Sequence, residues 1–248
     1  MTKMFKVDNK TMKTWNPIGG RCEHKCTYCW AQAEGGLVDK YKMGKYRGEP
    51  TLIAKELFRV FKPGETVFVQ DMSDLFAKNV KPHIIEGVLK HLAKFPETTF
   101  LLLTKNPARY YSFINYLTPN MICGATIETN RQNPDISNAP PPIYRFDSMR
   151  DLKWKNKFIS IEPVLDFDLD VFLKWLKVIA PQTIHIGYDN YNHRMGEPIL
   201  AKVESLISKL KIFIPNVEVK SMRTAWYEST DEKDREAIKK QLQVLGYL

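Results

Sequence analysis

The chain has 248 residues, of which 44% are hydrophobic and 26% are charged, as in ordinary soluble globular proteins. No apolar run approaches the roughly 18 residues that a membrane-spanning helix needs, so we expect no membrane partner. The formal net charge of +9 favours a polyanionic partner such as nucleic acid or a phosphorylated substrate. The lysines are spread along the whole chain, however, and a solvated basic surface would give the same charge.

The first predicted strand ends near Asn16-Pro17, after a polar and basic N-terminal stretch, and leads directly into a cysteine-rich loop. Residues 31–50 are rich in Gly, Lys and Tyr, which predicts an irregular segment before a first helix over about 50–61. A segment this long is more often functional than a linker.

Short apolar runs then alternate with amphipathic stretches. The runs are rich in β-branched and aromatic residues and predict buried parallel strands at 66–70, 99–103, 121–126, 157–161 and 183–187. Helices are expected at 82–94, 107–117, 143–153, 168–179 and 197–211. A further strand-like run covers 217–220, and a last helix is expected near 231–244.

This alternation predicts the α/β class, with six βα units around a parallel sheet that is closed or partly closed into a barrel. The composition does not shift along the chain. We therefore expect one domain over residues 1–248, with the barrel at about 13–211 and a C-terminal extension at about 212–248.

Three of the four cysteines form the pattern Cys22-x3-Cys26-x2-Cys29. Thiolates this close can ligate one metal centre, and three thiolates on a cubane iron–sulfur cluster leave one iron open for another ligand. With four cysteines and no signal peptide, we expect a reduced, cytoplasmic protein and no disulfide framework.

The alternative is a structural zinc site in which His24 completes a Cys3His set. Such a site would suit a nucleic-acid-binding module, which the positive charge and the tyrosines beside lysines at 41–46 favour. Replacing His24 separates the two hypotheses, because zinc binding would depend on this side chain and an iron–sulfur cluster would not.

Polar residues follow each predicted strand, at the barrel face where chemistry is usually located. They are Gln70-Asp71-Met72-Ser73-Asp74, Thr104-Lys105-Asn106, Thr126-Ile127-Glu128-Thr129-Asn130, Glu162-Pro163 and Tyr188-Asp189-Asn190. Helix capping is an alternative explanation for Ser73 or Asp74, Asn106, and Asp166 or Asp168. Lys105 and Glu162 are poor caps. We predict that Asp71, Glu162 and Asp189 are catalytic residues.

The cysteine spacing, with Tyr28 directly before the last cysteine, resembles the signature of the radical S-adenosylmethionine (SAM) superfamily. Within it the chain is similar to the spore photoproduct lyase and DNA-repair photolyase-like branch, and to uncharacterised radical SAM proteins of phages and microbes. The similarity spans about residues 13–190. It rests on the cysteine loop and on four further motifs, at 14–17, 68–76, 103–109 and 160–163.

The resemblance implies a partial (β/α)6 TIM-like barrel with the cluster loop after the first strand. It implies a [4Fe-4S] cluster on Cys22, Cys26 and Cys29, SAM on the open iron, and an external electron donor of the flavodoxin or ferredoxin type. Short hydroxyls and a lysine suit the polar aminoacyl end of SAM. The matching positions are Ser73, Lys105 and Thr126 at the aminoacyl group, Tyr28 at the adenine side, and Glu128 near the ribose or the substrate.

One position departs from the resemblance. Spore photoproduct lyase has a hydrogen-donating cysteine two residues before the matching serine, whereas this chain has Asp71, so we do not expect reversal of a thymine dimer by that route. Cys123 lies inside an apolar strand and is expected to be a core residue. A nucleic acid or nucleotide is the first candidate substrate, with a small metabolite or peptide as alternatives.

Two polar features of the sixth strand and its loop complete the predictions. His185 is expected to face away from Ile184 and Ile186, as a structural histidine with satisfied hydrogen bonds. Residues 190–194 are expected to form a polar loop over the barrel mouth.

Overall fold

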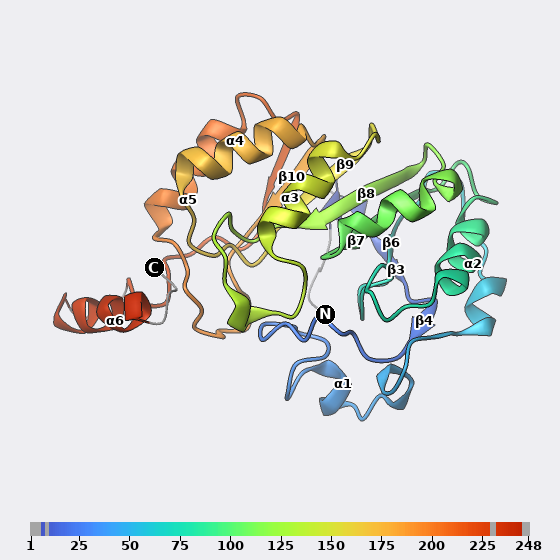
Figure 1. Ribbon diagram of the computed structural model, residues 1–248, viewed down its shortest axis with the longest axis horizontal. Coiled ribbons are helices and arrows are strands. Elements are labelled where there is room, and N and C mark those ends of the chain that lie inside the picture. Colours follow the sequence, from blue (N-terminus) through green and yellow to red (C-terminus); the bar gives the residue numbers. More distant parts are fainter. Residues whose placement is uncertain (1–5, 8–9, 229–231, 245–248) are drawn as a thin grey trace.

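A computed structural model describes the chain apart from residues 1–5, 8–9, 229–231 and 245–248. At its centre is a seven-stranded parallel sheet, curled into a half-barrel, with the strand order β11-β10-β9-β8-β7-β6-β3 (Figure 1). The strands are β3 (Lys13–Trp15), β6 (Thr66–Val69), β7 (Thr99–Thr104), β8 (Met121–Thr126), β9 (Lys157–Ile161), β10 (Thr183–Ile186) and β11 (Asn216–Val219). The predicted α/β partial barrel is confirmed, and its sheet continues through β11, beyond residue 211.

Helices cover the convex face of this sheet (Figure 1). They are α2 (Pro82–Leu92), α3 (Pro142–Asp151), α4 (Leu169–Ile179) and α5 (Leu200–Leu210), close to the predicted ranges. A 3₁₀ helix, η3 (Pro107–Tyr116), takes the place of the α-helix expected at 107–117. Its three tyrosines, phenylalanine and isoleucine are weaker α-helix formers than Ala or Leu, which agrees with this difference.

The predicted helix at 50–61 is wrong. Residues Thr51–Leu52 form β5, which pairs antiparallel with β4 (Ile18–Gly19), and a short 3₁₀ helix, η2 (Ala54–Phe58), follows. Pairing with a segment more than 30 residues away overrides the local helical preference here. The segment 31–50 contains only short elements, α1 (Leu37–Lys40) and η1 (Gly44–Tyr46).

The remaining elements lie outside the half-barrel sheet. They are the antiparallel pair β1 (Lys6–Val7) and β2 (Lys10–Thr11), the 3₁₀ turn η4 (Pro134–Ile136), and the last helix, α6 (Glu232–Val244). No helix in the described part of the chain is both long enough and apolar enough to cross a membrane.

Alternation along the strands separates two faces of the sheet. Val67, Val69 and Cys123 point to the convex side and join the main core with the helices. Cys123 is fully buried there, which confirms the prediction that it is a core residue. On the concave side Phe68 and Phe158 belong to a second, smaller apolar cluster. Polar side chains lie on the concave side, near the carboxyl ends of the strands.

Candidate active site

The cysteine loop follows β3 and begins at two glycines that permit a close backbone contact. Gly20 has a φ of +91°, and a Cβ on it would lie 2.5 Å from the carbonyl oxygen of Glu49. Its N–H donates to the carbonyl of Lys45 at 2.8 Å. A residue with a side chain would push the two segments apart, so glycine is required for the entry to the loop.

Gln32 fixes the shape of the cysteine loop. Its side-chain oxygen accepts the N–H of Cys22 at 2.8 Å, its own N–H donates to the sulfur of Cys29 at 3.2 Å, and its side-chain nitrogen donates to the carbonyl of Met72 at 2.9 Å. The thiol of Cys26 donates to the hydroxyl of Ser137 at 3.4 Å. All three cysteines are free thiols, and all line one cavity of about 1000 Å³. Sequence reasoning missed Gln32, because its role depends on the fold of the loop.

The donor set fits an iron–sulfur cluster better than a zinc ion. Within the described ranges no three His, Cys, Asp or Glu side chains are placed to hold a single metal ion. An iron–sulfur cluster does not require three side chains to meet at a single metal ion, because each cysteine binds a different iron. The ring Nε2 of His24 lies 2.8 Å from Asp74 Oδ2, and both side chains are buried. Its Nδ1 has no hydrogen-bond partner among the described residues, so the bond to Asp74 suits a structural histidine and a zinc-ligating histidine alike.

Asp74 connects the cysteine loop to the end of β7. Its carboxylate binds His24 and accepts the hydroxyl of Thr104 at 2.9 Å and the N–H of Lys105 at 2.8 Å. Burial opposes ionisation, but the charge and hydrogen bond of His24, with the bonds from Lys105 and Thr104, outweigh it and lower the pKa of Asp74. Helix capping does not account for Asp74, and Asn106 and Asp168 precede helices without making side-chain cap bonds.

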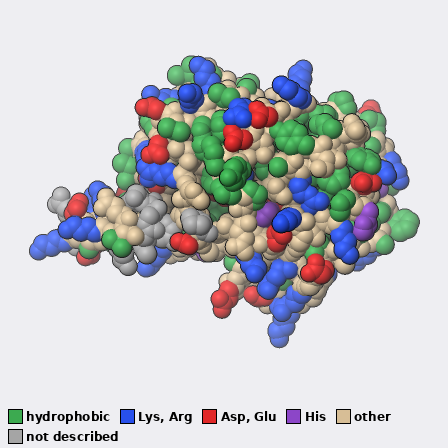
Figure 2. Space-filling model, viewed as in Figure 1, with side chains coloured by type: hydrophobic (Ala, Val, Ile, Leu, Met, Phe, Trp, Pro, Cys, Tyr) green, Lys and Arg blue, Asp and Glu red, His purple; other side chains and the backbone are tan. Residues whose placement is uncertain are grey.

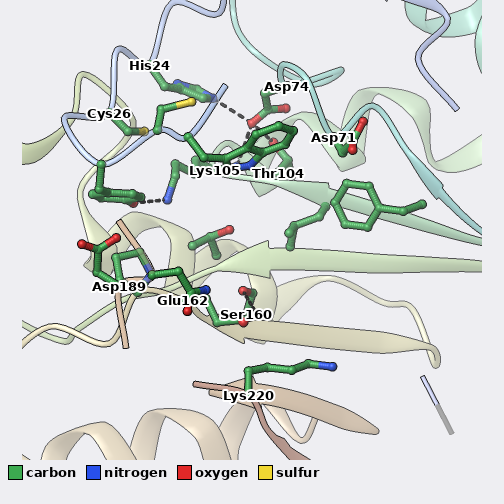
Figure 3. Close-up of a pocket in the computed structure, with 18 of the residues that line it drawn as sticks. His24, Cys26, Asp71, Asp74, Thr104, Lys105, Ser160, Glu162, Asp189 and Lys220 are labelled. Carbon is green, nitrogen blue, oxygen red and sulfur yellow. Dashed lines mark hydrogen bonds and ion pairs between the residues drawn. The ribbon is translucent and has the colours of Figure 1, made fainter. Parts of the chain in front are cut away.

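Lys105 belongs to a buried ionic network beside the cysteines (Figure 3). Its ammonium and the hydroxyl of Tyr28 both bind Glu128 Oε1. Arg145 Nη1 binds Glu128 Oε2 at 2.6 Å. Burial opposes ionisation of Glu128, yet the positive charges of Arg145 and Lys105 lower its pKa to about 2. The residue that closes this network, Arg145, lies on α3 and was not foreseen from the sequence.

The other predicted cofactor-binding residues meet at the same cavity, with one exception. Tyr28, Ser73, Lys105 and Thr126 line it. The hydroxyl of Ser73 also accepts a hydrogen bond from Gln70 Nε2 at 2.8 Å. Glu128 is not among the lining residues, because it lies buried behind Lys105 and Tyr28.

The three predicted catalytic residues also line the cavity. Asp71 accepts a hydrogen bond from Asn16 Nδ2 at 2.6 Å, and burial raises the pKa of its carboxyl. Asp189 accepts the N–H of His193 at 2.6 Å and that of Tyr191 at 3.1 Å, which shapes the loop after β10. Glu162 lies across the cavity from the cysteine loop, in the lower half of Figure 3.

The fold resembles that of spore photoproduct lyase. A variant of that enzyme with bound AdoMet and dinucleoside spore photoproduct matches with a TM-score of 0.56 and 8% identity, over 98% of this chain and 76% of that one. Another variant matches with a TM-score of 0.55 and 11% identity, over 83% of this chain and 75% of that one. The predicted resemblance to this radical SAM enzyme is thus confirmed at the level of the fold.

Sequence comparison places the chain in a family. No curated protein matches it. A family model matches residues 8–186, a range that includes the cysteine loop and the strands β3 to β10. The chain therefore belongs to the family described as "Protein of unknown function (DUF5131)".

Proposed function

We propose that this chain is a radical SAM enzyme that holds a [4Fe-4S] cluster on Cys22, Cys26 and Cys29. The observation that carries the proposal is the position of these three free thiols, which line one cavity with Lys105 at the carboxyl edge of the half-barrel. The three thiolates would hold the cluster, which, with an electron from a flavodoxin- or ferredoxin-type donor, would supply reductive cleavage of SAM to methionine and a 5′-deoxyadenosyl radical for hydrogen abstraction from the substrate.

The protein's own residues have separate tasks in this proposal. Lys105, held in place by its ion pair with Glu128, supplies a positive charge for the SAM carboxylate. Ser73 and Thr126 provide hydroxyl groups for the same end of SAM. Tyr28 borders the adenine side. The walls of the cavity exclude water and hold the substrate, which is the protein's contribution in cofactor-dependent chemistry.

Asp71, Glu162 and Asp189 are proposed to act on the substrate, because all three line the cavity. Asp71 cannot donate a hydrogen atom as a thiol does, and Cys123 is buried in the core on the far side of the sheet. The proposal therefore does not include repair of a thymine lesion by the spore lyase route.

A nucleic acid or nucleotide is our first candidate for the substrate. The segment after the cysteine loop exposes Lys40, Lys42, Lys45 and Arg47 beside the exposed ring of Tyr41, with Lys40 Nζ 5.7 Å from the centre of that ring. Figure 2 shows Lys and Arg side chains gathered over this segment at the lower edge of the molecule. Basic side chains with an exposed aromatic ring suit a phosphate backbone and its bases. A related structure contains a dinucleoside spore photoproduct.

We further propose that residues 1–248 form one radical SAM domain. Continuation of the sheet into β11 supports this, because part of the expected C-terminal extension pairs with β10.

Purification without oxygen tests the proposed function. We expect a brown protein with about four irons per chain and an electron paramagnetic resonance signal after reduction that changes when SAM is added. A Cys26→Ala variant should lose the iron. A colourless wild-type protein with one zinc per chain would contradict the proposal and support the zinc module.

A further inference from the structure

The end of the cavity opposite the cysteine loop carries its own cluster of polar side chains. Ser160 and Glu162 come from β9 and the residue after it, and Glu218 and Lys220 come from β11 and its end. Figure 3 places Ser160, Glu162 and Lys220 below the cavity, with Lys105 and Asp74 above it. A molecule bound beside the cysteines would therefore meet this second cluster across the cavity.

Glu162 is short of hydrogen-bond donors. Its Oε2 accepts a bond from the hydroxyl of Ser160 at 3.2 Å, whereas a carboxylate can accept about four. Burial raises the pKa of this carboxyl, and the negative charge of Glu218 adds to that effect against the opposing charge of Lys220. A donor from a ligand would stabilise the ionised form of Glu162 in this position.

His185 is a second buried group without a hydrogen bond beside these acids, although it does not itself line the cavity. Its ring has no exposed surface and lies between the two acids, with Nδ1 3.9 Å from Glu162 Oε2 and Nε2 3.3 Å from Glu218 Oε2. Neither ring nitrogen makes a hydrogen bond to a described residue. The prediction of a satisfied structural histidine is therefore wrong, although the ring does lie on the concave side, edge-on to Phe158.

Unpaired buried polar atoms are costly, and native proteins usually supply a protein, water or ligand partner. Glu162 and Glu218 are acceptors when ionised, and Lys220 donates one of its bonds to Glu218 Oε2 at 2.6 Å. Glu162 can therefore accept further hydrogen bonds from a donor group. A phosphate is disfavoured at this end, because the two carboxylates outnumber the ammonium of Lys220.

We propose that this end of the cavity is a subsite for the part of the substrate that donates N–H hydrogen bonds: an amine, an amidine or a lactam nitrogen, bound by Glu162 above His185. The inference rests on the proposed function and deepens it by naming a substrate class. A nucleotide would enter with the donor edge of its base toward Glu162 and keep its phosphates at the cavity mouth.

Binding of small probes tests the subsite. Guanosine and cytidine present a base with N–H donors, agmatine presents an aliphatic guanidinium, and inorganic phosphate serves as the anion. Each is titrated calorimetrically into the anaerobic, cluster-loaded protein with SAM present. We expect at least one nitrogen probe to bind, with a dissociation constant that rises at least about tenfold in Glu162→Gln. Binding of guanosine or cytidine would indicate a base as the natural ligand, and binding of agmatine would indicate an aliphatic guanidinium or amine.

Glu204→Gln is the matched control. It removes one negative charge, as Glu162→Gln does, but at an exposed position on α5 outside the cavity. It should bind the probes like the wild type. Glu162→Asp, which keeps the charge, should retain part of the affinity if Glu162→Gln proves unstable. The proposed subsite is contradicted if no nitrogen probe binds, or if both Glu162 variants bind the probes as tightly as the control does. It is also contradicted if phosphate displaces the nitrogen probe. Iron content and SAM binding, measured on the same samples, show separately whether the proposed function holds.

Discussion

Arg145 on α3 holds Glu128 at 2.6 Å, and Glu128 in turn binds both Lys105 and Tyr28. Arg145 also donates to the carbonyl of Pro140 at 2.6 Å. One guanidinium thus ties a helix on the convex side to the residue that precedes the last cysteine. The cysteine end of the cavity is therefore held in place by a residue that does not line the cavity.

An Arg145→Met variant tests this relationship. The variant removes one of the two cations that neutralise the buried Glu128 carboxylate. Removing one partner of a buried ion pair typically costs about 3–5 kcal/mol. We expect the free energy of unfolding to fall by an amount in this range, and the dissociation constant of SAM to rise about tenfold as Lys105 and Tyr28 lose their position. Urea unfolding and equilibrium binding measure the two effects. Arg150→Met, on the exposed face of the same helix, should change neither. Normal SAM binding in a folded Arg145→Met protein would contradict the assignment.

A His24→Asn variant separates the two metal hypotheses. The proposed cluster uses the three thiolates and leaves His24, whose Nε2 binds Asp74, outside the ligand set, so we expect about four irons per chain to be retained after anaerobic reconstitution. The protein should lose stability, because the buried Asp74 then keeps, among the described residues, its bonds to Thr104, Lys105 and Phe76 and loses the one to His24. Metal analysis is the measurement. Loss of all bound metal together with retained folding would favour the Cys3His zinc site instead.

Gly20→Ala should disrupt the entry to the cysteine loop. A Cβ there meets the backbone of Glu49 at 2.5 Å, in addition to the strain of a positive φ. Gly64→Ala is a matched control, since Gly64 also has a positive φ, +76°, but nothing within 4 Å of the added Cβ. We expect Gly64→Ala to cost about 1–2 kcal/mol and keep the cluster. Gly20→Ala should cost more and lower the iron content. Equal iron in the two variants would show that the close contact does not matter.

His185 should make stability depend on pH. Burial first, and the charge of Lys220 second, lower its pKa from 6.5 to about 3. Between these values the unfolded chain binds more protons than the folded one, so stability falls as the pH is lowered from 6.5 toward 3. The slope is at most about 1.4 kcal/mol per pH unit.

Urea unfolding at pH 6.5 and pH 5 measures this effect. A His185→Gln variant should lose less stability over that interval than the wild type, whereas His83→Gln, at an exposed position on α2, should behave like the wild type. The same pH dependence in all three proteins would mean that His185 is protonated in the folded state.

The sequence was sufficient to predict most of the architecture. The apolar runs of about five residues depend on local pattern, and they correctly predicted the sheet. Cys22, Lys105 and Glu162 do line one cavity, and their roles there stay predictions. The helix expected at 50–61 failed because β5 pairs with β4, a long-range contact with no local signal.

The partners of the site residues could not be predicted in the same way. Gln32, Arg145 and Glu218 come from a loop, a helix and an edge strand, and nothing in their neighbouring residues marks them. Their roles arise only when the fold brings them to Cys22, Glu128 and His185. The unsatisfied ring of His185 was likewise hidden, because strand alternation predicts which way a side chain points but not what it meets.

The most direct test of the central claim is whether the protein cleaves SAM reductively. The cluster-loaded protein is incubated without oxygen with SAM and dithionite, and the products are measured by mass spectrometry. We expect 5′-deoxyadenosine and methionine from the wild type, and neither product above background from Cys26→Ala. A wild-type protein that carries about four irons and binds SAM, yet forms no 5′-deoxyadenosine, would contradict the account.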